Sequence, residues 1–148
     1  KFMNSRGNIN WQQLSNTQSY KAWSGFAFEN VCLKHGDKLK EALGIAGVFT
    51  EISAFYFKGD RYLDGTQIDL VIDRNDNVIN VCEVKFYDKP FTLTKAYAHN
   101  LRQKLAIFQE KTKTRKTVFL TLITVFGIIP SMHSTGFVQQ EVLSDSLF

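Results

Sequence analysis

Three charged residues, Asp69, Glu83 and Lys85, stand inside two apolar, strand-like runs of the sequence. The polar turn at residues 75–77, Asn-Asp-Asn, joins the two runs, and this pattern predicts a β-hairpin. If the turn is centred on Asp76, Asp69 lies directly opposite Glu83 on the neighbouring strand. Lys85 then projects from the same face as Glu83, because side chains along a strand repeat with period two.

Two opposed carboxylates have Cβ atoms roughly 4.5–5.5 Å apart and repel each other unless a cation or a proton lies between them. An acid on one strand and Glu-Val-Lys on the next is the arrangement expected for metal-assisted phosphodiester hydrolysis. Asp69 and Glu83, with the Val84 carbonyl, are therefore the candidate ligands of Mg²⁺ or Mn²⁺. Such an ion lowers the pKa of a bound water and offsets transition-state charge. Lys85 would position or deprotonate that water, or stabilise the charge on the phosphorane.

The alternative is that Asp69 and Glu83 are exposed on a solvated sheet face, with Lys85 as a salt-bridge partner. A register shift of a single residue would remove the direct opposition of the two acids. The two interpretations differ in one structural expectation, namely whether the three side chains converge.

The composition fits one globular domain, with 148 residues, 44% hydrophobic residues and 13 Phe. The formal charge of +4 is compatible with a polyanionic partner. Cys32 and Cys82 lie in apolar runs without metal-ligand spacing, which predicts buried thiols in a reducing compartment. No signal peptide is visible, and the most apolar run, residues 118–129, is too short for a membrane helix. We therefore expect a cytoplasmic location without membrane association.

Residues 1–18 are rich in Asn, Gln and Ser, and we expect a linker or extension anchored by Ile9, Trp11 and Leu14. Residues 19–148 are the predicted domain, and because Lys1 is not an initiator residue we expect a fragment of a longer protein. Apolar residues at helical spacing predict one helix from residue 19 to Leu43, ended by Gly44.

The remaining pattern predicts strands, a second helix and further strands, in the coarse order α-β-β-β-α-β-β. This order indicates an α/β fold with a mixed sheet and helices packed on it. The predicted elements after the first helix are a strand at 47–58, the hairpin strands 67–74 and 78–86, a break at 88–90, a helix at 93–108, a buried strand at 117–126, a loop at 127–136 and an edge strand at 137–143.

Several short motifs follow one another in an order that resembles a known family. They are Trp23-x-Gly25-x-Ala27-Phe28-Glu29, Ala42-Leu43-Gly44-Ile45, Gly65-Thr66-Gln67-Ile68-Asp69-Leu70-Val71-Ile72-Asp73-Arg74 and Cys82-Glu83-Val84-Lys85-Phe86. This order resembles the PD-(D/E)XK nuclease superfamily, whose fold is restriction-endonuclease-like. More narrowly, it resembles the C-terminal nuclease-like domain of a family of prokaryotic AAA-type ATPases. No proline precedes Asp69, a departure that the superfamily tolerates.

The resemblance implies an αβββαβ core and a metal-dependent nuclease site. It implies Asp69, Glu83 and Lys85 as the core residues of that site and Glu29 as the acid contributed by the helix. It also implies Mg²⁺ or Mn²⁺ as cofactor, nucleic acid, chiefly DNA, as substrate, and an AAA-type ATPase domain of the same protein as partner. Nucleases of this kind are often homo-oligomers. The rival expectation is a catalytically silent DNA-binding or assembly module that retains the fold.

Four further polar residues are candidates for substrate binding. Gln67 shares a face with Asp69, and His99, Arg102 and Gln103 share the polar side of the second predicted helix. The alternative for these residues is a solvent-exposed face. A set of basic residues, Arg102, Lys104, Lys111, Lys113, Arg115 and Lys116, is placed to meet phosphates, with a solvated helix end as the alternative.

Overall fold

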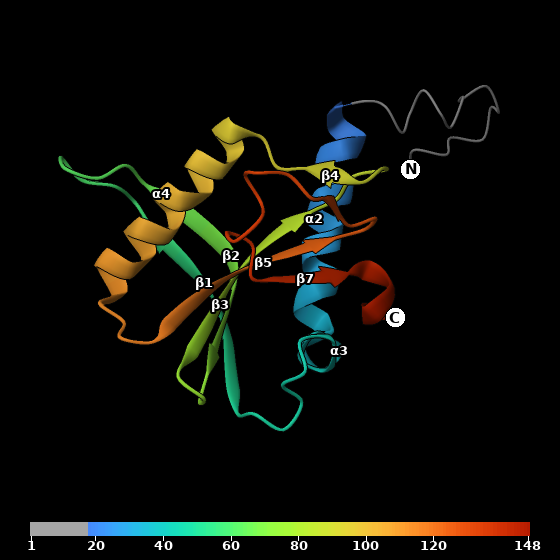
Figure 1. The fold of residues 1–148 in the computed structure, drawn as a ribbon, viewed down its shortest axis with the longest axis horizontal. Helices are drawn as coiled ribbons and strands as arrows, with labels where there is room; N and C mark the ends of the chain where they lie inside the picture. The colour runs from blue at the N-terminus through green and yellow to red at the C-terminus, as the bar shows by residue number, and fades with distance from the viewer. Residues whose placement is uncertain (1–17) are drawn as a thin grey trace.

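The protein is described by a computed structural model that covers residues 18–148, with the side chains of the first helix described from Ser24 onward. Residues 1–17, including Ile9, Trp11 and Leu14 of the predicted extension, lie outside the described residues. Figure 1 shows a central sheet with helices packed against it. In chain order the described elements are α2 (Gln18–Lys34), α3 (Gly36–Ala42), β1 (Thr50–Phe57), β2 (Thr66–Arg74), β3 (Val78–Lys85), β4 (Phe91–Thr92), α4 (Lys95–Thr112), β5 (Thr117–Thr124), β6 (Ile128–Ile129), β7 (Gln140–Leu143) and the 3₁₀ helix η1 (Ser144–Leu147).

The main sheet has the strand order β1-β2-β3-β5-β7. The pairs β1–β2 and β2–β3 are antiparallel, whereas β3–β5 and β5–β7 are parallel. Helix α4 forms the crossover from β3 to β5, as a parallel connection requires. The mixed sheet and the αβββαβ order of elements confirm the predicted fold class.

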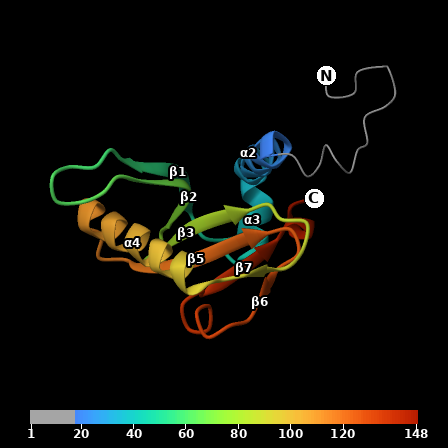
Figure 2. The same cartoon turned by 90° about the horizontal axis from the view of Figure 1, so that it is seen from above.

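Helices cover both faces of this sheet (Figure 2). On one face, α2 and α3 pack through Phe28, Cys32 and Leu39. On the other face, α4 packs through Leu101 and Phe108. Successive side chains of the inner strands point to opposite faces of the sheet. Both faces are apolar, as expected for buried strands with parallel neighbours. The strand residues facing α2 and α3 are Leu70, Ile72, Cys82 and Ile123, and those facing α4 are Val71, Ile79, Val81, Leu120 and Leu122.

The first predicted helix is two helices, so the expectation of one continuous helix from residue 19 to Leu43 is wrong. The break falls at His35, and α3 begins at Gly36. A side chain at Gly36 would place its Cβ 2.9 Å from Ile52 Cδ1, so a larger residue there would require the end of the Ile52 side chain to move. Gly44 ends the helical segment with φ of +73°, as predicted from its position.

Most predicted strands are present, with shifted ends. β1 is shorter than the predicted residues 47–58, and β7 occupies only the last part of the predicted edge strand. β5 is an inner strand whose last five residues are buried, as expected for a central strand. The expected loop at residues 127–136 contains β6, which pairs with β4 in a second small sheet. Two-residue strands carry no periodicity, so the sequence pattern did not reveal this pair.

Helix α4 begins and ends with recognisable caps. Thr94 Oγ1 accepts a hydrogen bond from the Tyr97 backbone N–H at 3.2 Å, and Lys113 ends the helix with φ of +53°. Leu93, predicted as a helical residue, lies just before the helix and is buried. Neither α4 nor any other helix among residues 18–148 combines the length and the apolar character that a membrane crossing needs.

Candidate functional site

The hairpin β2–β3 has the predicted register. Leu70 pairs with Cys82 and Asp73 with Ile79, and the same register continued by one residue places Asp69 opposite Glu83. The turn between the strands contains Asn77, whose φ of 68° lies in the left-handed region. Asn adopts this conformation more readily than most residues, so the turn chemistry helps to set the register on which the site depends.

A β-bulge changes the direction of the side chains at Asp69. In the pairing with β1, Ser53 lies opposite Val71 and Phe55 lies opposite Ile68, so β2 has one extra residue at this point. A bulge re-aims the side chains beside it. Ile68 consequently packs on the α4 side with Val71, although strict alternation along β2 would place it on the same face as Leu70. Asp69 itself contacts α2.

Glu29 of α2 lies in hydrogen-bond contact with Asp69 of β2. The pKa of Glu29 is raised to about 7, chiefly by partial burial and then by the charge of Asp69, their shared hydrogen bond and the charge of Glu83, while Lys85 acts to lower it. All four residues therefore lie close enough to influence one carboxyl group. They come from three elements, α2, β2 and β3, and this convergence is what the exposed-face alternative did not predict.

Glu83 is held from the α4 side. The Tyr97 hydroxyl donates a hydrogen bond to Glu83 Oε2, and Lys104 Nζ lies 3.3 Å from Oε1. Lys85 Nζ lies 3.6 Å from Oε2 and also 4.8 Å from the centre of the Tyr97 ring. The Glu83 side chain is only 14% exposed, so its charge depends on these partners rather than on water.

Tyr97 acts as a hydrogen-bond donor at every ordinary pH. Burial raises the pKa of its hydroxyl far above the usual value, and the negative charge of Glu83 raises it further. The hydroxyl therefore keeps its proton and donates a hydrogen bond to Glu83. Tyr97 and Lys104 are seven residues apart on one face of α4, which lets both reach the same carboxylate.

The candidate substrate-binding residues divide into two groups. Gln67 belongs to the site, because its Nε2 donates to Asp69 Oδ1 at 2.5 Å. Arg102 instead lies over the Phe137 ring at 4.4 Å, and Gln103 lines a surface pocket with Tyr62. Within the described part of the chain the structure records no contact of His99, Arg102 or Gln103 with the acidic cluster.

Two of the basic residues expected to meet phosphates are paired with acids. Lys111 Nζ lies 3.3 Å from Asp60 Oδ2, and Lys116 Nζ lies 2.6 Å from Asp73 Oδ1. Among residues 24–148, whose side chains the structure describes, Lys104 is the one member of the predicted basic set that contacts a residue of the acidic cluster. The sequence signal for its role is its spacing from Tyr97, a residue that shares helical spacing with the apolar residues Leu101 and Leu105.

The carboxylates have the chemistry of a divalent-cation site but do not surround one point. Among the described residues, no three His, Cys, Asp or Glu side chains are placed to hold one ion together. Asp69 contacts Glu29 of α2, whereas Glu83 contacts Tyr97 and Lys104 of α4. Carboxylate oxygens are ligands that Mg²⁺ and Mn²⁺ prefer, so the donor chemistry, though not the present arrangement of the side chains, fits either ion.

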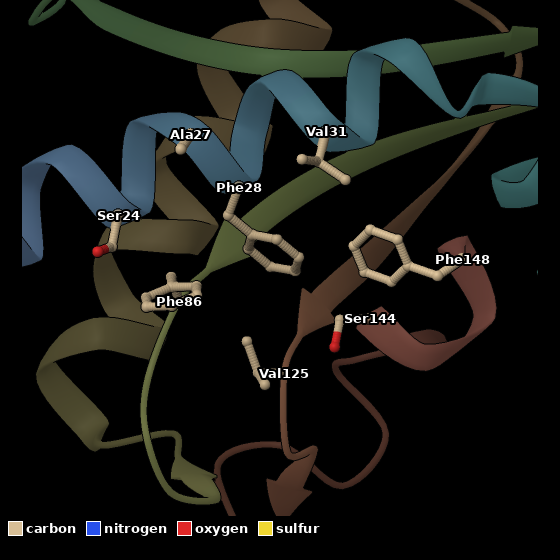
Figure 3. Close-up of a pocket in the computed structure, with 8 residues that line it drawn as sticks. All are labelled: Ser24, Ala27, Phe28, Val31, Phe86, Val125, Ser144 and Phe148. Atoms are coloured by element: carbon tan, nitrogen blue, oxygen red, sulfur yellow. The ribbon is translucent and has the colours of Figure 1, made fainter.

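An apolar cavity of about 270 Å³ lies beside this cluster (Figure 3). Phe28, which precedes Glu29, and Phe86, which follows Lys85, both line it, and their rings meet edge to face at 5.7 Å. None of the four charged residues lines the cavity. The other lining residues are Ser24, Ala27, Val31, Val125, Ser144 and Phe148. The cavity therefore belongs to the packing behind the site rather than to its chemistry.

The cysteines are buried, as predicted. Cys32 and Cys82 are both free thiols, and burial raises the pKa of Cys32 to about 12. Such thiols are unreactive and take no part in the site.

The chain matches no family model, no curated protein and no solved structure. The nuclease resemblance therefore stays a prediction, and the function is argued from the residues of the site.

Proposed function

We propose that this chain is a metal-dependent nuclease domain that hydrolyses phosphodiester bonds, with DNA as its substrate. The observation that carries the proposal is that Asp69, Glu83 and Lys85, from two strands, lie close enough to Glu29 of α2 to influence its pKa. The order of helices and strands around the hairpin supports it, because it is the order that the resemblance to PD-(D/E)XK nucleases implies.

Each residue has a definable role in this proposal. Asp69 and Glu83, with the Val84 carbonyl, are the candidate ligands of Mg²⁺ or Mn²⁺, and Glu29 is the helix acid that shares the negative charge with Asp69. The ion would supply a water of lowered pKa and offset the charge of the transition state. Lys85 positions or deprotonates the attacking water, or stabilises the charge that develops on the phosphorus centre.

Tyr97 and Lys104 act as positioning residues in this proposal, because they reach the reaction only through Glu83. A hydrogen bond and an ion pair from α4 hold the carboxylate in one orientation. Removal of the Tyr97 hydroxyl is therefore expected to lower activity or metal affinity by about 10- to 100-fold. Lys104 differs, because its ammonium also competes with a metal ion for Glu83, so its removal is expected to have only a few-fold effect.

The position of this domain within a longer protein is proposed from the resemblance alone. We place the domain C-terminal to an AAA-type ATPase domain of the same protein, which would control access to DNA.

A second candidate function is a catalytically silent module that keeps the fold for DNA binding or assembly. Two lysines favour this function, because the ammonium groups of Lys85 and Lys104 are enough to offset the negative charge of Glu83. In a silent module these ion pairs would be structural, and the pairing of Glu29 with Asp69 would have no chemical use.

DNA cleavage distinguishes the two candidates. The purified chain is incubated with plasmid and with single-stranded DNA in Mg²⁺ or Mn²⁺, beside a Glu83→Ala, Lys85→Ala double variant. The matched control is Glu51→Gln, which removes an exposed acid of β1 outside the site. Nuclease function predicts cleavage by the wild type and the control, and a loss of about 100-fold or more in the double variant. Equal cleavage by all three chains, or none by any, would contradict it.

A further inference from the structure

A chain of aromatic rings leads outward from the charged cluster. Tyr97, which donates to Glu83, meets the Phe91 ring edge to face, with centroids 5.5 Å apart. Phe91 in turn stacks on Tyr87 with centroids 5.0 Å apart and ring planes only 13° from parallel. Tyr87 is thus two ring contacts away from the residue that holds Glu83.

The inner members of this chain are fixed by the backbone. Phe91 belongs to β4, which pairs with β6, and its backbone N–H donates to the Gly127 carbonyl at 2.9 Å. Tyr97 lies in the first turn of α4, where Thr94 caps the helix. Phe91 is partly buried between these supports, so it offers Tyr87 a rigid base on which to stack.

The outer end of the chain is open to solvent. Tyr87 is 43% exposed, a large fraction for an aromatic ring that is already stacked on one side. Two lysines lie at the inner end of the chain of rings: Lys85, two residues before Tyr87 in the sequence, lies over the Tyr97 ring, and Lys104 pairs with Glu83. Exposed aromatic rings that stack on bases, together with cations that meet the phosphates, are the features that hold unpaired nucleic acid.

We propose that Tyr87, backed by Phe91, stacks on an unpaired nucleobase and so selects single-stranded or locally unpaired nucleic acid for the site at Glu83 and Lys85. This inference rests on the proposed function and names its substrate class. A base in an intact duplex is stacked between its neighbours and has no free face for Tyr87. The chemistry recognised is the face of an unpaired base, in DNA or in RNA.

Fluorescence anisotropy in EDTA tests the inference without any cleavage. The probes are a labelled oligothymidine, the matching oligouridine and a blunt duplex. Tyr87→Leu removes the ring, Tyr87→Phe restores it without the hydroxyl, and Tyr62→Leu removes an aromatic that is 82% exposed on the β1–β2 loop. Thermal unfolding of each variant verifies that it is folded.

The expected result is that Tyr87→Leu weakens binding of the single strands by about one to two orders of magnitude. Tyr87→Phe and Tyr62→Leu should bind them as the wild type does, and the duplex should show no dependence on Tyr87. The tighter of the two single strands identifies DNA or RNA as the source of the base. Unchanged single-strand affinity in Tyr87→Leu, an equal loss on the duplex, an equal loss in Tyr62→Leu, or no binding by the wild type would overturn the inference.

Failure of this inference and failure of the nuclease proposal give different results. Binding that depends on Tyr87, without any cleavage in Mg²⁺ or Mn²⁺, would refute the nuclease and leave the stacking site. Cleavage of single strand and duplex at equal rates in both the wild type and Tyr87→Leu would refute the stacking site and leave the nuclease.

Discussion

Glu29 on α2 and Asp69 on β2 are two acids held in hydrogen-bond contact with each other. Such a contact is stable only while one of the two carboxyl groups keeps its proton, or while a cation takes the place of that proton. Glu83 and Lys85 lie near enough to change the pKa of Glu29 as well. The pair is therefore the most sensitive reporter of the proposed site.

The first prediction concerns stability against pH. Glu29 in the folded chain keeps its proton up to a pKa of about 7, whereas the ordinary value is 4.5. Its stabilising contribution is therefore complete below about 4.5 and is lost as the pH rises to about 7, so the free energy of unfolding should fall across this window. Urea unfolding at a series of pH values measures this slope.

Glu29→Gln should flatten that slope, and Glu51→Gln, an exposed acid of β1, should leave it unchanged. The pKa values of Asp60 and Asp76 are lowered below the ordinary 3.8, by backbone hydrogen bonds and by Arg74 respectively, so these groups titrate below the window. A Glu29→Gln slope equal to that of the wild type would show that the Glu29–Asp69 contact does not hold a proton.

The second prediction concerns Tyr97. Tyr97→Phe removes the hydroxyl that orients Glu83 and leaves the ring in edge-to-face contact with Phe91. We expect the rate of DNA cleavage at limiting Mg²⁺ to fall by about 10-fold or more, with little change in thermal stability. The control is Tyr62→Phe, which removes an exposed hydroxyl. Wild-type cleavage by Tyr97→Phe would mean that Glu83 needs no support from α4.

The third prediction concerns Lys104, whose ammonium offsets the charge that a divalent cation would otherwise meet on Glu83. Lys104→Met should lower the Mg²⁺ concentration that half-saturates cleavage, by a few-fold, since partly exposed ion pairs contribute about 0.2–1 kcal/mol. Lys111→Met removes a lysine of the same helix that pairs with Asp60 instead, and it should leave that concentration unchanged. If Lys104→Met alone required more Mg²⁺ for half-saturation, Lys104 would not be competing with Mg²⁺ for Glu83.

The fourth prediction concerns the turn that sets the register of β2 and β3. Asn77 has φ of 68°, a conformation that costs a β-branched residue about 1–2 kcal/mol. Asn77→Val should therefore lower the free energy of unfolding by about that amount, whereas Asn77→Gly should be tolerated. Urea unfolding compares the two variants directly. A Val variant as stable as the Gly variant would show that the turn can relax without loss.

The hairpin was the most predictable part of the fold. The Asn-Asp-Asn turn and the alternation on both sides of it determine the pairing of β2 with β3, so the register from Leu70 opposite Cys82 to Asp73 opposite Ile79 follows from local sequence. The bulge at Asp69 could not be predicted, because it depends on the pairing with β1, and the sequence of β2 alone does not show an extra residue. The orientation of Asp69 toward α2 therefore emerged only from the structure.

The support of Glu83 from α4 was harder to predict for a different reason. Tyr97 fits the apolar stripe of its helix, and its partly buried ring does pack there, so the pattern gave no sign that its hydroxyl reaches a carboxylate. Likewise, the first helical segment divides at His35, where Gly36 lies close to Ile52 of β1, a contact distant in sequence. Contacts between separate elements decided both features.

The proposed function requires that a divalent cation bound at Asp69 and Glu83 displaces the proton that Glu29 holds beside Asp69. Calorimetric titration of Mg²⁺ into the wild type, about one pH unit below the Glu29 pKa and in two buffers of different ionisation enthalpy, measures both binding and proton release. The account predicts binding with the release of close to one proton per ion, lost in Asp69→Asn and retained in Glu51→Gln. Absence of binding, or binding that releases no proton and survives Asp69→Asn, would contradict it.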